Sequence, residues 1–194
     1  NYTNSPENVK VDDGNLFIFA RNEGGYTSAR IKTQGIYDFQ YGRVDIRAML
    51  PIGQGIWPAL WMLGSDITTE SWPACGEIDI MELVGHLPGS CHGTAHWGTV
   101  DNVQSSGGSI YADDWTTGFH TYTVEWWPDH MQWSVDGQVY FNLDRTQISP
   151  DPWLFGEDYH MLLNVAVGGG WPGSPNASTV FPQEMKVDWV RVYE

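Results

Sequence analysis

The fold is constrained above all by the lack of helical signals: no stretch of about ten residues combines helical periodicity with helix caps. The 22 glycines and 11 prolines instead divide the chain into short apolar runs. The run at 42–50 is the clearest, because Val44 and Ile46 alternate with Arg43 and Asp45. This alternation is typical of an antiparallel strand with one buried face. The sequence therefore predicts an all-β sandwich or barrel.

Alternation and turn residues together predict a set of strands. They cover residues 16–20, 27–33, 42–50, 56–63, 76–84, 91–97, 120–127, 131–135, 139–143, 160–167 and 185–193. The segments predicted as loops are 64–75, 98–119 and 150–158. Asp136-Gly137 is typical of a tight hairpin turn. Pro58 predicts that its strand lies at a sheet edge, contains a bulge, or is just beginning to pair.

Length and charge limit the domain count and the partners. A chain of 194 residues is predicted to form one domain, 1–194, with a sizeable core. Its net charge of −15 argues against nucleic acid or an anionic membrane as a partner. No apolar run approaches the roughly 20 residues of a membrane span. We expect a secreted monomer that acts on a neutral polymer. No signal peptide is present, so secretion requires that the mature form begins here.

The two cysteines are predicted to be free. Cys75 and Cys91 each stand at the start of one of two adjacent predicted strands. In an antiparallel pair these positions lie about 25 Å apart at 3.3 Å per residue. A disulfide requires Cα atoms within about 7 Å. Two buried thiols are therefore expected.

An acidic segment lies within the predicted strand 76–84. Glu77 and Asp79 are two residues apart and share one face of a strand, whereas Glu82 would point away. One extra residue, most simply Met81, makes a β-bulge that returns Glu82 to the same face. Three carboxylates on one face of an apolar strand are destabilising unless they have a function. The segment is therefore a candidate site.

The surroundings of the acids favour a sugar site over an exposed acidic face, which a lone E-x-D more often forms. Six aromatic or imidazole side chains are expected nearby: Trp57, Trp61, Trp72, Trp97, His92 and His96. Pairing of the predicted strand 91–97 with 76–84 places His96 roughly opposite Ile78, near enough to reach Asp79. Aromatic walls suit the flat C–H faces of pyranose rings. Two carboxyl groups can cleave a glycosidic bond, one by attacking the anomeric carbon and the other by protonating the leaving oxygen. Two glutamates on one bulged strand favour the separation of about 5–5.5 Å typical of retaining enzymes.

Several motifs resemble glycoside hydrolase family sixteen. Residues 77–82, Glu-Ile-Asp-Ile-Met-Glu, resemble the bulged form of the family signature E-x-D-x-x-E. Residues 55–63, 72–77, 92–97, 164–169 and 187–193 resemble the bacterial laminarinases, which are endo-1,3-β-glucanases. The resemblance extends over essentially the whole chain. It implies a β-jelly-roll sandwich of two antiparallel sheets, with the substrate cleft on the concave sheet.

The same resemblance implies roles for individual residues. Glu77 would be the nucleophile, Asp79 the assisting acid and Glu82 the acid/base of a retaining double displacement. Four residues would bind the β-glucan: Trp61 and Trp72 by stacking on sugars, His96 by supporting Asp79 or the substrate, and Arg30 by bonding hydroxyls. No cofactor would be needed for catalysis.

The resemblance also implies a structural calcium ion, with Asp188 and the backbone near Gly14 among its ligands. Family members usually begin with a further strand and loop that supply other ligands, so the chain is expected to be truncated at its N-terminus. One carboxylate with carbonyls and water makes a weak site, because calcium takes six to eight oxygens.

Three alternatives remain. A non-catalytic glucan-binding protein would typically lack Glu77 and Glu82, and both are present. A hydrolase for mixed-linkage glucan would usually lack the extra Met81, and charged galactans would require a more basic cleft. A metal site built from His92, His96 and the acids lacks an H-E-x-x-H arrangement.

Overall fold

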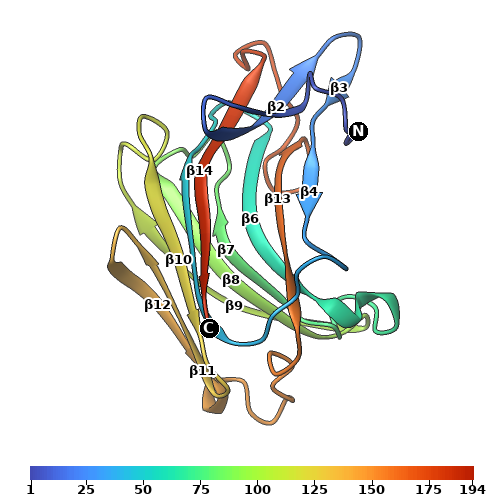
Figure 1. The fold of residues 1–194 in the computed structure, drawn as a ribbon, viewed down its shortest axis with the longest axis vertical. Coiled ribbons are helices and arrows are strands. Elements are labelled where there is room, and N and C mark those ends of the chain that lie inside the picture. Colours follow the sequence, from blue (N-terminus) through green and yellow to red (C-terminus); the bar gives the residue numbers. More distant parts are fainter.

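The computed structural model describes residues 1–194 and shows two packed antiparallel sheets (Figure 1). The strands are β1 (Val9–Asp12), β2 (Asn15–Asn22), β3 (Tyr26–Thr27), β4 (Arg30–Lys32), β5 (Gly42–Met49), β6 (Ile56–Gly64), β7 (Glu77–Glu82), β8 (Ser90–Thr99), β9 (Asn102–Tyr111), β10 (His120–Trp126), β11 (His130–Val135), β12 (Gln138–Asp144), β13 (Tyr159–Val167) and β14 (Gln183–Tyr193). Two short 3₁₀ helices, η1 (Ser65–Thr68) and η2 (Arg145–Gln147), complete the fold. The prediction of an all-β sandwich is confirmed.

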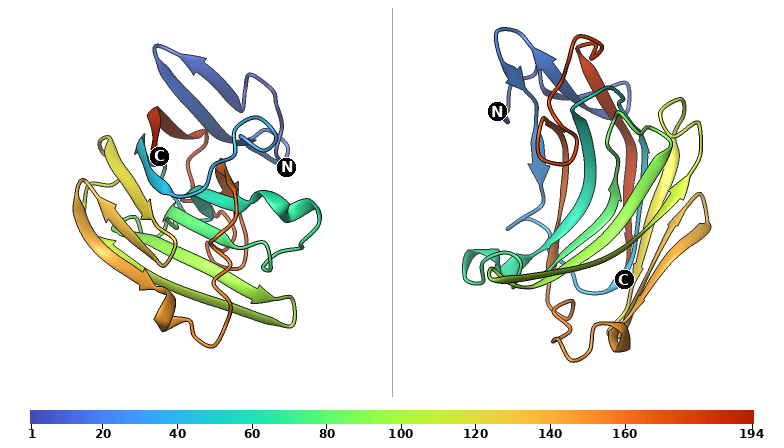
Figure 2. Two further views of the ribbon diagram at one scale, coloured as in Figure 1. Left: turned by 60° about the horizontal axis from the view of Figure 1, so that its bottom comes forward. Right: turned by 180° about the vertical axis from the view of Figure 1, so that it is seen from behind.

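The two sheets differ in size and curvature. The larger has the order β1-β2-β14-β5-β10-β11-β12, with β3 paired to β2, and the smaller has the order β4-β13-β6-β7-β8-β9. Figure 2 shows the strands of the smaller sheet bending around the long axis of the molecule. No helix is long and apolar enough to cross a bilayer.

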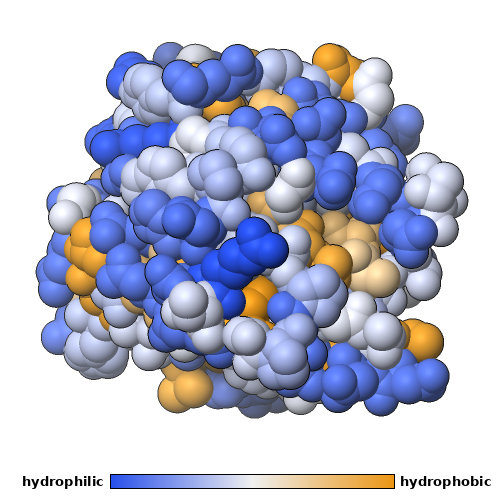
Figure 3. All heavy atoms as spheres, turned by 90° about the horizontal axis from the view of Figure 1, so that it is seen from below, coloured by the Kyte–Doolittle hydropathy of each residue, from blue (hydrophilic) through white to orange (hydrophobic).

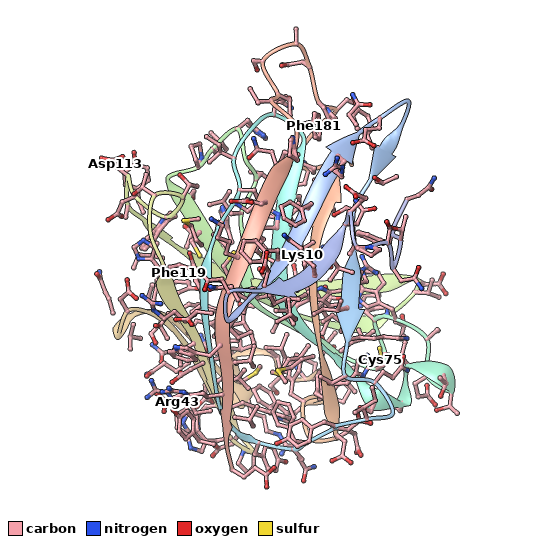
Figure 4. All side chains as sticks on the ribbon, turned by 45° about the horizontal axis from the view of Figure 1, so that its top comes forward. Lys10, Arg43, Cys75, Asp113, Phe119 and Phe181 are labelled. Atoms are coloured by element: carbon pink, nitrogen blue, oxygen red, sulfur yellow. The ribbon has the colours of Figure 1, made fainter.

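The core forms between the sheets as the alternation predicts. Val44 and Ile46 of β5 are fully buried, whereas Arg43 is exposed on the outer face. Asp45 is also buried, but its carboxylate accepts hydrogen bonds from Arg43 and from Thr123 Oγ1, both at 2.7 Å. Figure 4 shows side chains filling the space between the layers and labels Arg43 on β5. The face shown in Figure 3 is mostly hydrophilic, with hydrophobic groups in separate patches.

The structure corrects two predicted segments and narrows the alternatives for Pro58. Residues 98–119, predicted as a loop, contain β9, which pairs along its whole length with β8. Its serines and glycines are typical of loops, but they also fit an edge strand. Residues 27–33 do not form one strand, because β3 pairs with β2 whereas β4 pairs with β13 in the other sheet. Of the three alternatives for Pro58, the edge is excluded because β6 lies between β13 and β7. Pairing of β6 with β7 begins at the next residue, Ala59.

The thiol prediction is confirmed. Cys75 and Cys91 are both buried and free. Burial raises the pKa of Cys75 to about 11 and raises that of Cys91 still further. Both side chains are therefore protonated and unreactive at neutral pH.

Candidate active site

A bulge in β7 brings the three acids to one face. Asp79 pairs with Thr94 of β8 and Glu82 pairs with His92, so two residues of β7, Ile80 and Met81, lie opposite the single residue Gly93 of β8. On the other side Ile80 has no partner on β6. The predicted bulge is confirmed, although the unpaired residue opposite β6 is Ile80, since Met81 pairs with Leu60. The side chains of Ile80 and Met81 are buried in the core, and the acids line the cleft.

Burial dominates the electrostatics of the three carboxyl groups. Burial and, to a smaller extent, the charge of the neighbouring Asp79 raise the pKa of Glu77 to about 8, while His96 opposes the shift. Burial also raises the pKa of Glu82 to about 7, against the lowering effect of a hydrogen bond from Trp57. The pKa of Asp79 lies well above its usual range because of burial and the charge of Glu82. The cluster therefore retains protons at neutral pH, as a site that must donate one requires.

His96 connects two of the acids. Its Nε2 lies 3.1 Å from Asp79 Oδ2 and 4.0 Å from Glu77 Oε1. The sequence predicted that His96 would lie opposite Ile78 and contact Asp79. His96 lies opposite Glu77 instead, one residue away, and the predicted contact with Asp79 is confirmed. Donor atoms of Glu77, Asp79 and His96 all lie within 4.8 Å of one another, so these are the residues that could hold a metal ion here.

Aromatic side chains line the cleft, and their indole groups are fixed by hydrogen bonds. Trp57 Nε1 donates to Glu82 Oε1 at 2.9 Å, and Trp61 Nε1 donates to Asn164 Oδ1 at 2.9 Å. Trp72 is 40% exposed, with its ring centroid 6.2 Å from that of His96. Trp97 was also expected near the acids, but it points into the core and is 5% exposed.

The acids form the floor shared by two connected hollows. One, of about 160 Å³, contains all three acids together with Arg30, Trp61 and Asn164. The other, of about 400 Å³, contains both glutamates and lies between Trp72 and His92. Arg30 stacks between Tyr2 and Trp61, with its guanidinium carbon 4.7 and 5.2 Å from the two ring centroids. All four residues predicted to bind substrate thus line one continuous cleft on the smaller sheet.

Sequence reasoning missed Trp171. This residue lies in the glycine-rich turn after β13 and is 43% exposed. Its ring packs edge-on against Trp57 at 5.5 Å and against His92 at 5.2 Å, closing one side of the larger hollow. A large ring among glycines and prolines has no strand in which to be buried. This is the signal that identified Trp72, and it would have identified Trp171 too.

The residues expected at a calcium site are occupied by other interactions. The Asp188 carboxylate forms an ion pair with the guanidinium of Arg47. Gly14 lies in the turn between β1 and β2, with a positive φ of 74°. No cluster of three acidic, histidine or cysteine ligands includes Asp188. A guanidinium against the carboxylate opposes a second cation, so these residues alone do not fit a calcium ion.

Comparison with known proteins identifies the family to which this fold and cleft belong. Residues 1–191 match the family described as "Glycosyl hydrolases family 16". The chain belongs to this family. It is 42% identical to the "Glucan endo-1,3-beta-glucosidase A1" of Niallia circulans, covering 100% of this chain and 32% of that protein. It is 42% identical to the "Beta-glucanase" of Rhodothermus marinus, covering 96% of this chain and 70% of that protein.

A solved laminarinase has the same fold. The catalytic domain of the Thermotoga maritima enzyme superposes with a TM-score of 0.91 at 42% identity, covering 100% of this chain and 82% of that one. The family-16 resemblance and the jelly-roll fold expected from the sequence are therefore confirmed. The chain spans only about a third of the Niallia protein, so the similarity concerns its family-16 domain.

Proposed function

We propose that this family-16 chain is an endo-acting, retaining glycoside hydrolase that cleaves internal β-1,3 bonds of laminarin-type β-glucans. The observation that carries the proposal is the β7 bulge, which gathers Glu77, Asp79 and Glu82 on the floor of a cleft walled by tryptophans. Similarity to endo-1,3-β-glucanases supports the choice of linkage.

The proposed reaction is a double displacement. The Glu77 carboxylate attacks the anomeric carbon while Glu82 donates a proton to the departing glycosidic oxygen, leaving a glycosyl ester on Glu77. Water then enters, Glu82 takes its proton, and the ester is released with the original anomeric configuration. Asp79, on the same face of β7 as Glu77 and 3.1 Å from His96 Nε2, would hold the nucleophile in place. Burial, together with the charge of Glu77, raises the pKa of Glu82 and so favours its protonated form.

The assignment of the two glutamates needs a direct test. In the free protein the pKa of Glu77 is about 8 and that of Glu82 about 7, the reverse of the order that a nucleophile and an acid would have. The difference arises because Glu77 faces Asp79 whereas Glu82 accepts the indole N–H of Trp57. A 2-fluoroglucoside that traps the glycosyl ester should label Glu77. Labelling of Glu82 would reverse the roles.

The proposed substrate lies across the smaller sheet. Trp61 and Trp72 would stack on sugar rings, Arg30 would bond hydroxyls, and Trp171 would contact sugars beyond the scissile bond. We further propose that the chain acts as a secreted monomer without a catalytic cofactor, since a neutral polymer suits its net charge of −15. We do not propose the structural calcium ion that the sequence resemblance implied, because the Arg47–Asp188 ion pair opposes a cation at Asp188.

Reducing-sugar release from laminarin, barley glucan and agarose tests the proposal. Laminarin should be cleaved fastest, and proton NMR of the first products should show the β-anomer. Activity on barley glucan alone would favour the mixed-linkage alternative. Binding to laminarin without cleavage would favour the glucan-binding alternative, and an initial α-anomer would refute retention.

A further inference from the structure

Trp133 connects the larger sheet to the acidic strand. It lies on β11, is fully buried, and donates its Nε1–H to the backbone carbonyl oxygen of Asp79 at 2.8 Å. Asp79 belongs to β7 in the opposite sheet. A single hydrogen bond thus crosses the sandwich and ends at the residue where the bulge begins.

The Asp79 carbonyl is available to this donor because the strand is irregular there. In a regular strand, carbonyls point within the sheet toward neighbouring strands, out of reach of the other sheet. After Asp79 the ladder is interrupted: Ile80 has no partner on β6, and pairing with β8 resumes at Glu82. A carbonyl turned into the core without a donor is destabilising. Trp133 supplies that donor.

The neighbouring strands leave room for the indole. A Cβ atom at Gly93 of β8 would collide with Cδ1 of the Trp133 ring. Gly93 precedes Thr94, which pairs with Asp79. On the opposite side, the register between β11 and β12 shifts directly after Trp133. The ring therefore lies between two irregular positions, one in each sheet.

We propose that Trp133 is a positioning residue, which fixes the Asp79 peptide and so the bulge that sets Glu82 beside Glu77. The inference rests on the proposed function, because it concerns the same carboxyl groups. Without the Trp133 hydrogen bond the Asp79 peptide can rotate, and the carboxyl groups of Glu77 and Glu82 lose their fixed separation. Most sugar-contacting residues come from other strands and loops, so catalysis should suffer more than binding.

Trp133→Phe removes the N–H and keeps an aromatic ring. Trp126→Phe is the matched control, because Trp126 is equally buried and donates to the carbonyl of Phe155 at the same 2.8 Å, within the core. Both variants should lose about 2–4 °C or more of Tm, because each removes one buried hydrogen bond from a chain of this size. Only Trp133→Phe should lower kcat on laminarin, by about tenfold to a hundredfold, with KM within about twofold. Equal effects on kcat would overturn the proposal.

A second measurement does not require hydrolysis. Four titratable groups face Asp79: Glu77, Glu82 and His96 in the cleft, and Tyr140 from the core. Carbon-13 NMR titration of the three carboxyl groups should differ from wild type in Trp133→Phe but not in Trp126→Phe. Unchanged curves in both variants would overturn the proposal, whereas wild-type inactivity on glucan would refute only the proposed function. If Trp133→Phe does not fold, Gly93→Ala, which displaces the ring, takes its place in both comparisons.

Discussion

Replacing Trp57 by phenylalanine should reveal which chemical role Glu82 plays. Trp57 Nε1 donates to Glu82 Oε1 at 2.9 Å, and this bond opposes the burial that raises the pKa of Glu82 to about 7. A hydrogen bond to a charged group contributes about 1.5–3 kcal/mol, and 1.36 kcal/mol corresponds to one pH unit. Because the bond stabilises the ionised form, its removal should raise the pKa of Glu82 by roughly 1–2 pH units.

Which limb of the pH profile of kcat/KM moves depends on the chemical role of Glu82. If Glu82 is the acid, it must be protonated in the free enzyme, so the alkaline limb of kcat/KM should move to higher pH by about 1–2 units. If Glu82 is the nucleophile, it must be ionised, and the acid limb should move instead. Profiles of kcat/KM against pH on laminarin distinguish the two cases.

Trp61→Phe is the matched control for this experiment. Like Trp57, Trp61 lines the cleft and donates its Nε1–H at 2.9 Å, but its acceptor is the neutral amide oxygen of Asn164. This variant should weaken substrate binding without moving either limb. A shift of the acid limb in Trp57→Phe would make Glu82 the nucleophile. No shift of either limb, or equal shifts in both variants, would refute the argument that the Trp57 hydrogen bond lowers the pKa of Glu82.

The remaining predictions concern catalysis, binding, metal and stability. Glu77→Ser and Glu82→Ser should each lose at least about a thousandfold in kcat yet remain folded, and more than a few per cent of residual laminarin hydrolysis would contradict the assignment. Trp72→Ala should raise KM by about threefold to tenfold with little change in Tm, because its ring is exposed and is proposed to stack on sugar; a large loss of Tm with unchanged KM would make it a structural residue. Dialysis against EDTA should leave both kcat and Tm unchanged, and recovery of either on adding calcium would establish a metal site. The folded-state pKa of Glu77, about 8, exceeds its ordinary value of 4.5, so folding favours its protonated form and stability should fall as the pH rises from about 4.5 to 8; Glu77→Gln should reduce this slope in denaturant titrations, and an unchanged slope would contradict the burial argument.

The features predictable from the sequence depend on local periodicity. Val44 and Ile46 identify a strand because alternation is a property of neighbouring residues. The bulge in β7 could be inferred because Glu82 lies three residues from Asp79, and a regular strand cannot present both on one face. The register between two paired strands is harder to predict from the sequence, because it depends on the turn that joins them. For that reason His96 was placed one residue away from its partner, Glu77.

What the sequence could not provide are contacts between elements that no local pattern relates. The serines and glycines of β9 carry the composition of a loop, and only the adjacent β8 makes them a strand. Trp97 and Trp133 look alike as aromatic residues near β-branched or small neighbours, yet one fills the core and the other reaches the acidic strand. The difference arises from the register shift after Trp133 and the space above Gly93, both of which exist only once the sheets have packed. The acids can therefore be named from six consecutive residues, whereas Trp133, which donates to the Asp79 carbonyl, comes from the opposite sheet and is related to them by no local pattern.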